Sequence, residues 1–164
     1  MASHEYFQDK LVGNHCFGCG ADNPHGLQIK SYWEGENLSV CQFNPLYYHT
    51  AAPSHFLNGG IIAMIIDCHC ICTAIAYAYQ FQEREIGEGN PIWFATSNLT
   101  LNYKRPVNIA EQVILEASVM DYDEKRASLA CKLTSEGKTC VEATLEAIAV
   151  TEEWMNKSPD KNRI

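Results

Sequence analysis

Residues 59–79 form an almost unbroken apolar run, and this run constrains the fold more than any other feature of the chain. A helix that is apolar on every side must be enclosed by other parts of the protein. About 20 apolar residues could also cross a bilayer, but Asp67 and His69 lie near the middle of the run, and a central Asp costs roughly 2.5–3.5 kcal/mol on insertion. We therefore predict a helix wrapped by a sheet, with no membrane partner.

Segments of alternating polarity on both sides of this run predict strands. Two precede it and four follow it, at residues 27–33, 38–43, 93–104, 113–119, 127–133 and 139–150. In the first strand after the helix, strict alternation places Leu99 on one face and Thr96 and Asn98 on the other. This order of elements predicts an α+β domain, an antiparallel sheet wrapped around one long central helix. The free edges and outer face of such a sheet could pair with a second subunit.

Length and composition limit the domain count and the partners. A chain of 164 residues is long enough for one core and short for two, so we predict a single domain over residues 1–164. Residues 1–26 are an N-terminal segment with a Cys-x-x-Cys loop, and residues 151–164 are a polar, frayed tail. The net charge of −8 and the scattered basic residues argue against nucleic acid. The N-terminus resembles no secretory signal, so we expect a cytoplasmic location.

The segment Asn58-Gly59-Gly60 begins the apolar helix and can be interpreted in two ways. Glycines at a helix start leave backbone N–H groups unshielded, so a partly negative oxygen can approach them closely. This is an oxyanion site in outline. The same glycines could serve only a tight turn and close packing, and spacing alone does not separate the two.

Asp67 is the candidate general base. Its helical neighbours, Ala63, Met64, Cys70 and Ile71, cannot pair with a carboxylate. It therefore needs a partner from elsewhere in the fold or a raised pKa, and either condition suits a base near neutral pH. The alternative is a structural hydrogen bond. Gly60 and Asp67 are about 10 Å apart along the helix, so one reacting carbon cannot be served by both. Two antiparallel helices in a two-fold dimer would bring them together and form two composite sites.

Three segments, taken in order, resemble the PaaI-like hotdog acyl-CoA thioesterases: Cys16-Phe17-Gly18-Cys19-Gly20-Ala21-Asp22-Asn23-Pro24-His25-Gly26-Leu27, Asn58-Gly59-Gly60 with Asp67, and residues 96–106. The resemblance covers about residues 16–150. It implies a hotdog fold, hydrolysis of an acyl-CoA to a carboxylic acid and CoA, and a homodimer or a dimer of dimers. No cofactor is expected beyond the CoA of the substrate.

The same resemblance implies roles for individual residues. The acid of the family that activates water falls on Asp67, and the amide that polarises the carbonyl falls on Gly59, with Gly60 beside it. The Ser or Thr that assists the water falls on Thr96, which could also be an ordinary strand hydroxyl. The candidates for substrate binding are His55, Asn98, Lys104 and Arg105. Lys104 and Arg105 suit the phosphates of CoA, or are a solvated strand end.

Asn58 stands where the family has a His. An amide can cap a helix and donate a hydrogen bond, but it cannot titrate near neutral pH. His55 or His69 could compensate. The departure keeps two other functions open: a non-catalytic acyl-CoA-binding domain, and a hotdog hydratase or dehydratase acting on an acyl thioester.

The cysteines do not predict a metal site. Eight are present, and in a reducing compartment most are small buried hydrophobic residues. Cys16 and Cys19 form one Cys-x-x-Cys, with His15 and His25 nearby. Structural zinc usually takes four ligands, commonly in paired motifs, and the second Cys pair is absent. We therefore expect no metal, and the Cys-x-x-Cys as loop residues.

Overall fold

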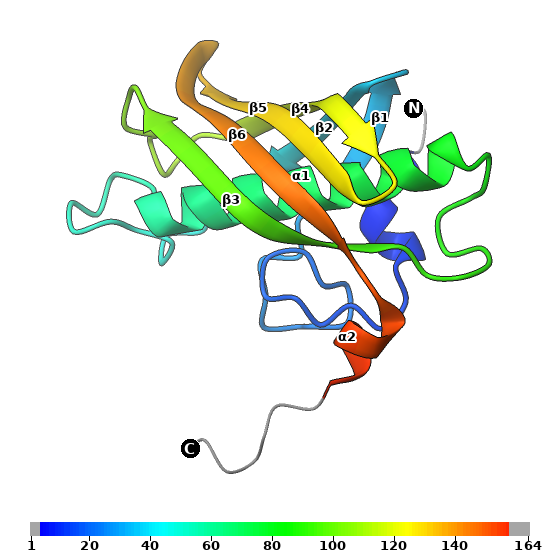
Figure 1. The fold of residues 1–164 in the computed structure, drawn as a ribbon. Helices are drawn as coiled ribbons and strands as arrows, with labels where there is room; N and C mark the ends of the chain where they lie inside the picture. Colours follow the sequence, from blue (N-terminus) through cyan, green and yellow to red (C-terminus); the bar gives the residue numbers. More distant parts are fainter. Residues whose placement is uncertain (1–3, 158–164) are drawn as a thin grey trace.

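The computed structural model describes residues 4–157, and one six-stranded antiparallel sheet dominates it (Figure 1). The strand order is β1-β2-β4-β5-β6-β3. The strands are β1 (Ser31–Gly35), β2 (Leu38–Phe43), β3 (Trp93–Tyr103), β4 (Val113–Asp123), β5 (Arg126–Ser135) and β6 (Lys138–Val150). One long helix, α1 (Gly59–Phe81), crosses the concave face of the sheet. The predicted α+β hotdog architecture is confirmed.

The apolar run forms α1 because its side chains pack against the sheet on one side and the N-terminal segment on another. Figure 1 shows the sheet above α1 and residues 11–30 beneath it. Ile65, Ile66 and Ile75 are almost fully buried against the inner face of the sheet. By length and composition alone α1 could span a membrane, but 67% of its apolar window is buried inside the protein.

One stripe of α1 is covered by neither layer, which corrects the prediction that the helix is completely enclosed. The stripe contains half-buried or exposed residues at helical spacing: Gly60, Ala63, Met64, Asp67 and Ile71. Residues at i, i+3, i+4 and i+7 lie on one face of a helix. A mainly apolar face with a single carboxylate therefore remains open over the first half of α1.

A β-bulge in β3 corrects the predicted face of Thr96. The pairing with β6 shifts register between Thr96, opposite Ala147, and Asn98, opposite Glu146. Ser97 is the extra residue, and its hydroxyl donates to the Glu146 carbonyl at 3.0 Å. Because a bulge adds one residue, the alternation changes phase there. Thr96 therefore lies on the same inner face as Leu99, and Asn98 lies on the outer face.

The remaining differences from the sequence predictions concern where strands begin and end and two short helices, one before and one after the sheet. The first strand begins at Ser31 rather than residue 27. The short 3-10 helix η1 (Phe7–Lys10) lies in the N-terminal segment, and its Phe7 is buried in the core. The helix α2 (Glu152–Asn156), capped by Thr151, occupies part of the tail predicted to be frayed. The predicted ends at residues 1–3 and 158–164 lie outside the described residues.

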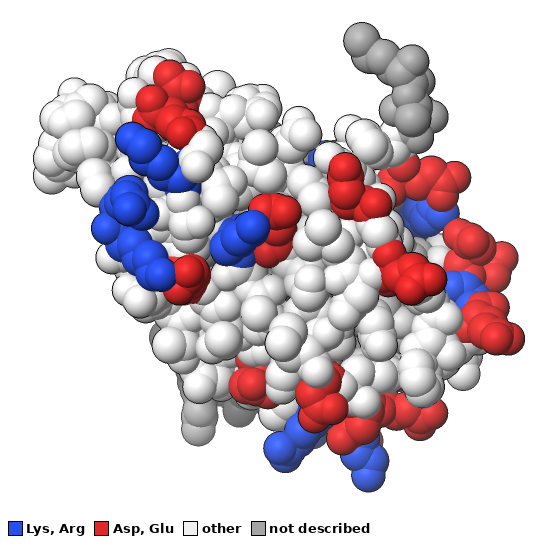
Figure 2. Space-filling model, turned by 90° about the horizontal axis from the view of Figure 1, so that it is seen from above, with Lys and Arg blue, Asp and Glu red and all other residues white. Residues whose placement is uncertain are grey.

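The outer face of the sheet carries charges of both signs. Figure 2, seen from above the sheet, shows Lys and Arg beside Asp and Glu, with uncharged surface between them. Two ion pairs join side chains of the sheet strands and the end of β3, Lys132 with Glu116 at 3.0 Å and Lys104 with Glu142 at 2.6 Å. Such mixed charges neutralise one another locally, so the viewed face lacks the continuous basic surface that attracts a phosphate backbone.

Candidate active site

Asp67 lies in the open stripe of α1 and is bonded across to β3. The Thr96 hydroxyl donates to Asp67 Oδ1 at 2.5 Å. Within residues 4–157, Asp67 Oδ2 has no hydrogen-bond partner and Asp67 has no ion pair. Partial burial raises the pKa of Asp67, the Thr96 hydroxyl opposes this shift, and the Cys19 thiol adds to it. A half-buried carboxylate with one free oxygen can accept a proton from water.

The bulge in β3 makes the contact between Thr96 and Asp67 possible. Without the extra residue, the Thr96 side chain would point away from α1. Bulges are common beside active sites, where they redirect a side chain. The structure therefore brings Asp67 and Thr96, the two residues that the resemblance selected, into contact. Simple alternation along β3 had predicted Thr96 on the opposite face from Leu99.

The start of α1 leaves one backbone amide unoccupied. Asn58 is the N-cap, and its side-chain Oδ1 accepts from the N–H groups of Gly60 at 2.8 Å and Ile61 at 3.2 Å. The amide of Gly60 is therefore already used. The Gly59 N–H donates to no acceptor within residues 4–157 and lies at an exposed helix start. Of the two glycines, Gly59 is the one whose amide can bind an oxygen with partial negative charge.

Tyr103, which belongs to the segment 96–106, connects this helix start to the sheet through a hydrogen bond. Its hydroxyl donates to the Gly59 carbonyl at 2.7 Å, and burial raises the pKa of the phenol. Tyr103 is on the inner face of β3, in the phase set by the bulge. In the sequence, the signal for Tyr103 was its position directly before Lys104-Arg105-Pro106, at the end of a predicted strand.

Asp67 and the Gly59 amide share one helix but are well separated. Eight residues at about 1.5 Å each place them about 12 Å apart along α1. Both face the open side of the helix, so a second molecule could reach both. Within one chain they cannot act on the same carbonyl carbon.

The predicted substrate-binding residues are spread over three places. His55 is exposed in the loop before α1, with its ring 4.0 Å from that of Phe56. Asn98 is exposed on the outer face of β3, away from Asp67. Lys104 pairs with Glu142. Arg105 donates to the Thr139 carbonyl at 2.8 Å. Lys104 and Arg105 each use part of their N–H groups in these interactions, but each keeps free hydrogen-bond donors at the end of β3.

His69 cannot replace the missing family His. It is fully buried, and its two ring nitrogens lie 2.8 Å from the Ser31 hydroxyl and 3.3 Å from the Ser39 hydroxyl. Burial lowers the pKa of His69 to about 4, so the ring is neutral at physiological pH. The side chain belongs to a buried polar network between α1 and the first two strands.

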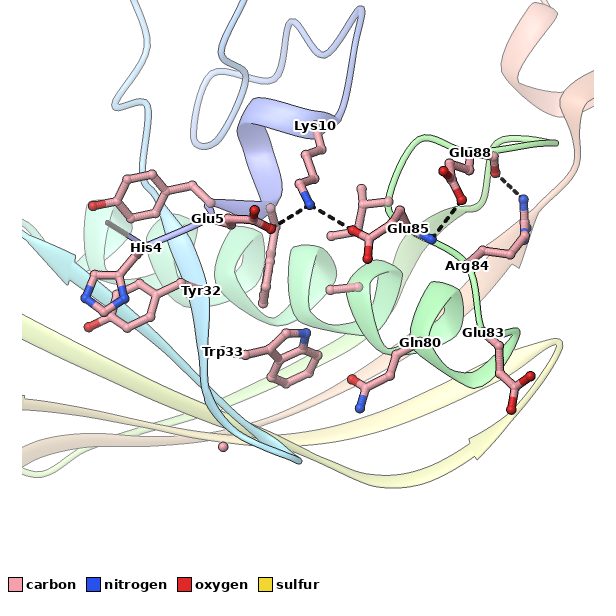
Figure 3. Close-up of a pocket in the computed structure, with 15 residues that line it drawn as sticks. His4, Glu5, Lys10, Tyr32, Trp33, Gln80, Glu83, Arg84, Glu85 and Glu88 are labelled. Atoms are coloured by element: carbon pink, nitrogen blue, oxygen red, sulfur yellow. Dashed lines mark hydrogen bonds and ion pairs between the residues drawn. The ribbon is translucent and has the colours of Figure 1, made fainter. Parts of the chain in front are cut away.

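A cavity of about 580 Å³ lies at the opposite end of α1 (Figure 3). Lys10 reaches into it and pairs with Glu5 and Glu85 at 2.8 and 2.9 Å. The lining includes neither Asp67 nor Gly59, and four of its side chains are glutamates: Glu5, Glu83, Glu85 and Glu88. An acidic cavity is a poor place for the phosphates of CoA, so we do not assign the site here.

Comparison with known proteins identifies the fold class. No family model and no curated protein matches the sequence. Several structural neighbours are described as thioesterases or thioesterase superfamily proteins. One from Shewanella loihica PV-4 is 25% identical, with a TM-score of 0.64 over 85% of this chain and 97% of that one. A phenylacetic acid degradation-related protein from Ralstonia eutropha JMP134 is 16% identical, with a TM-score of 0.59 over 74% and 85%.

A third neighbour is a hypothetical thioesterase from Streptococcus pneumoniae TIGR4, solved with coenzyme A. It is 10% identical, with a TM-score of 0.61 over 74% of this chain and 85% of that one. The chain therefore has the hotdog fold of the thioesterase superfamily, and its neighbours include a PaaI-like protein. At these identities the likeness to the second and third neighbours concerns the fold alone.

Proposed function

We propose that this protein is a cytoplasmic acyl-CoA thioesterase that works as a homodimer, with two composite sites at the subunit interface. The observation that carries the proposal is Asp67, a carboxylate with a raised pKa whose one hydrogen bond within the described residues comes from Thr96. The fold and the coenzyme A in the Streptococcus pneumoniae neighbour support the substrate class.

In the proposed reaction, water attacks the thioester carbonyl. Asp67 Oδ2 takes a proton from the water, while the Thr96 hydroxyl holds Oδ1 and fixes the orientation of the carboxylate. The negative charge that develops on the carbonyl oxygen is stabilised by the Gly59 N–H and the positive end of the α1 dipole. The intermediate then releases CoA as a thiolate, which takes up a proton. The products are a carboxylic acid and CoA, and no step needs a metal ion.

A dimer reconciles this chemistry with the separation of Asp67 and Gly59. If the open stripes of two α1 helices pair in antiparallel orientation, Asp67 of one chain approaches the Gly59 amide of the other. The apolar residues of the stripe, such as Met64 and Ile71, would be buried by the same contact. The strand β3 is at the edge of the sheet, beside the stripe, and its open backbone could add to the interface.

The CoA portion requires cations near the site. The exposed cations Lys104 and Arg105 at the end of β3 follow Tyr103, which is bonded to Gly59. Their unused N–H groups could bind phosphate oxygens while the thioester lies at the helix start. His55, in the loop that leads into α1, is a further candidate contact.

A panel of acyl-CoA esters, of different lengths and with aromatic members, tests the activity and the acyl preference together. Released CoA should be separated by chromatography, because a thiol reagent would also react with the exposed Cys16. Turnover of at least one ester is expected. If no ester is hydrolysed while CoA still raises the melting temperature, the protein binds acyl-CoA without catalysis.

The departure at Asn58 favours the non-catalytic acyl-CoA-binding function, since the family His is absent and the side-chain Oδ1 of Asn58 is used in capping the helix. The other rival, hydration or dehydration of an enoyl thioester, is followed through double-bond absorbance in the same panel. Loss of that absorbance without release of CoA would replace the thioesterase assignment.

The composite site has a separate test that uses two inactive variants. Gly59→Pro removes the proposed amide donor at the first helical position, where Pro is well tolerated, and Gly59→Ala is the control that keeps it. Asp67→Asn removes the base. Mixed dimers of the two variants contain one site with both Gly59 and Asp67 intact, so co-expression should recover about a quarter of the parent activity. No recovery in verified mixed dimers contradicts a shared site.

A further inference from the structure

Three cysteine thiols gather where the N-terminal loop packs on α1. The Sγ atoms of Cys16, Cys19 and Cys68 all lie within 4.8 Å of one another, and Cys16 Sγ is 3.6 Å from Cys68 Sγ. Among the described residues these three form the one group of His, Cys, Asp or Glu side chains close enough to share an ion. A fourth cysteine, Cys72, is buried one helical turn after Cys68 on α1.

The loop holds its two cysteines toward the helix. The Gly20 N–H donates to the Cys16 carbonyl at 2.8 Å, and the Asn14 side chain accepts from the Cys16 N–H at 3.0 Å. A Cβ on Gly18 would lie 2.3 Å from Cys68 Sγ, so only glycine allows the loop to approach α1 this closely. Contacts of the loop backbone and of the Asn14 side chain therefore hold the two loop cysteines against α1.

The helix supplies the second cysteine pair that the sequence analysis found missing. Cys16 and Cys19 face Cys68 from the loop. Cys72 is four residues after Cys68, so both lie on one helix face. A three-residue step in a loop and a four-residue step on a helix are spacings used by structural zinc ligands. The two pairs are at least 49 positions apart in sequence, so a local search for a motif does not find them together.

We propose that Cys16, Cys19, Cys68 and Cys72 bind a structural zinc ion. Sulfur ligands select soft or borderline metals such as zinc, and four thiolates leave no open position for chemistry at the metal. The ion would hold the loop of residues 14–29 against α1 at Cys68, the residue after Asp67. This proposal does not depend on the thioesterase assignment.

Metal content of the full-length protein is the first test. Protein purified without chelator should contain about one zinc per chain. Reduced, metal-free protein titrated with Co²⁺ should develop sulfur-to-cobalt charge-transfer bands and the intense visible bands of a tetrahedral site. Absence of both zinc and cobalt binding overturns the proposal. So does a Cys16–Cys68 disulfide, detected by mass spectrometry as the native state of these residues.

Single substitutions then assign the ligands. Cys16→Ser is the main variant because Cys16 is exposed and its loss should not unfold the protein. It should weaken Co²⁺ binding by at least about a hundredfold, since even outer-shell changes weaken metal sites by 10- to 100-fold. Cys72→Ser should reduce the charge-transfer intensity, and unchanged intensity removes Cys72 from the ligand set. Cys140→Ser, a buried cysteine in β6, is the control. Equal loss in the Cys140 and Cys16 variants contradicts the site.

Discussion

Asp67 and His69 lie two positions apart on α1, yet they occupy opposite environments. His69 is enclosed by β1 and β2, and both ring nitrogens have hydroxyl partners. Asp67 lies in the open stripe, and Thr96 is its one partner within the described residues. Burial shifts the pKa of each toward its neutral form, lowering that of His69 and raising that of Asp67. The histidine is the more familiar catalytic residue, but the unused capacity for hydrogen bonding belongs to the aspartate.

The largest expected effect tests Asp67 as the base. Asp67→Asn should reduce turnover by about a hundredfold or more, because the amide cannot accept the proton from water, while its oxygen can still accept the Thr96 hydrogen bond. Steady-state kinetics at neutral pH measures the loss, and circular dichroism checks the fold. Asp121→Asn, at an exposed position in β4, is the control. Equal turnover in the parent protein and in Asp67→Asn would show that Asp67 is not the base, and the proposed functional difference between Asp67 and His69 would be lost.

The second prediction concerns His69 and stability. A histidine whose folded pKa is about 4, below its ordinary 6.5, contributes stability that is complete above 6.5 and declines as the pH falls toward 4. Between pH 6.5 and 5 this loss is about 2 kcal/mol, at 1.36 kcal/mol per pH unit. His69→Leu should remove that part of the pH dependence, measured by urea unfolding at several pH values. His55→Leu, at an exposed position, should leave the slope unchanged. A slope that persists in His69→Leu assigns the acid sensitivity to other groups.

The third prediction tests the role of Thr96, whose hydroxyl donates to the Asp67 carboxylate. Thr96→Val deletes the hydroxyl that opposes the rise in the Asp67 pKa. The acidic limb of the kcat/KM profile should therefore move to higher pH, and turnover at neutral pH should fall about tenfold, the scale of one hydrogen bond to a charged group. Thr100→Val, an exposed position on the outer side of β3, is the matched control. If turnover falls while the acidic limb of the kcat/KM profile stays in place, Thr96 contributes to the reaction without changing the pKa of Asp67.

The sequence predicts the helix and the sheet well because both depend on local periodicity. The apolar run specifies α1 from Gly59, and alternating segments specify the strands. The sequence selects Asp67 and Thr96 for one site only through family resemblance, and their contact was not predicted, since the bulge at Ser97 breaks the alternation that places side chains. The cysteine cluster depends on a loop that packs against a distant helix, and the state of His69 depends on hydroxyls from two strands. Neither follows from spacing along the chain.

The smallest expected effect is the stability of Asp67→Asn itself, which has the opposite sign to that of His69. The folded pKa of Asp67 lies above its ordinary value of 3.8, so folding favours the protonated acid. This contribution of Asp67 to the stability of the fold is complete below pH 3.8. It is lost as the pH rises through the folded pKa of Asp67. The Asn variant does not titrate, and it should therefore gain stability relative to the parent as the pH rises from 3.8, by less than the His69 effect. Urea unfolding at acid and neutral pH measures the difference. A variant that becomes less stable than the parent with rising pH would mean that ionised Asp67 is stabilised in the fold, as a structural carboxylate would be.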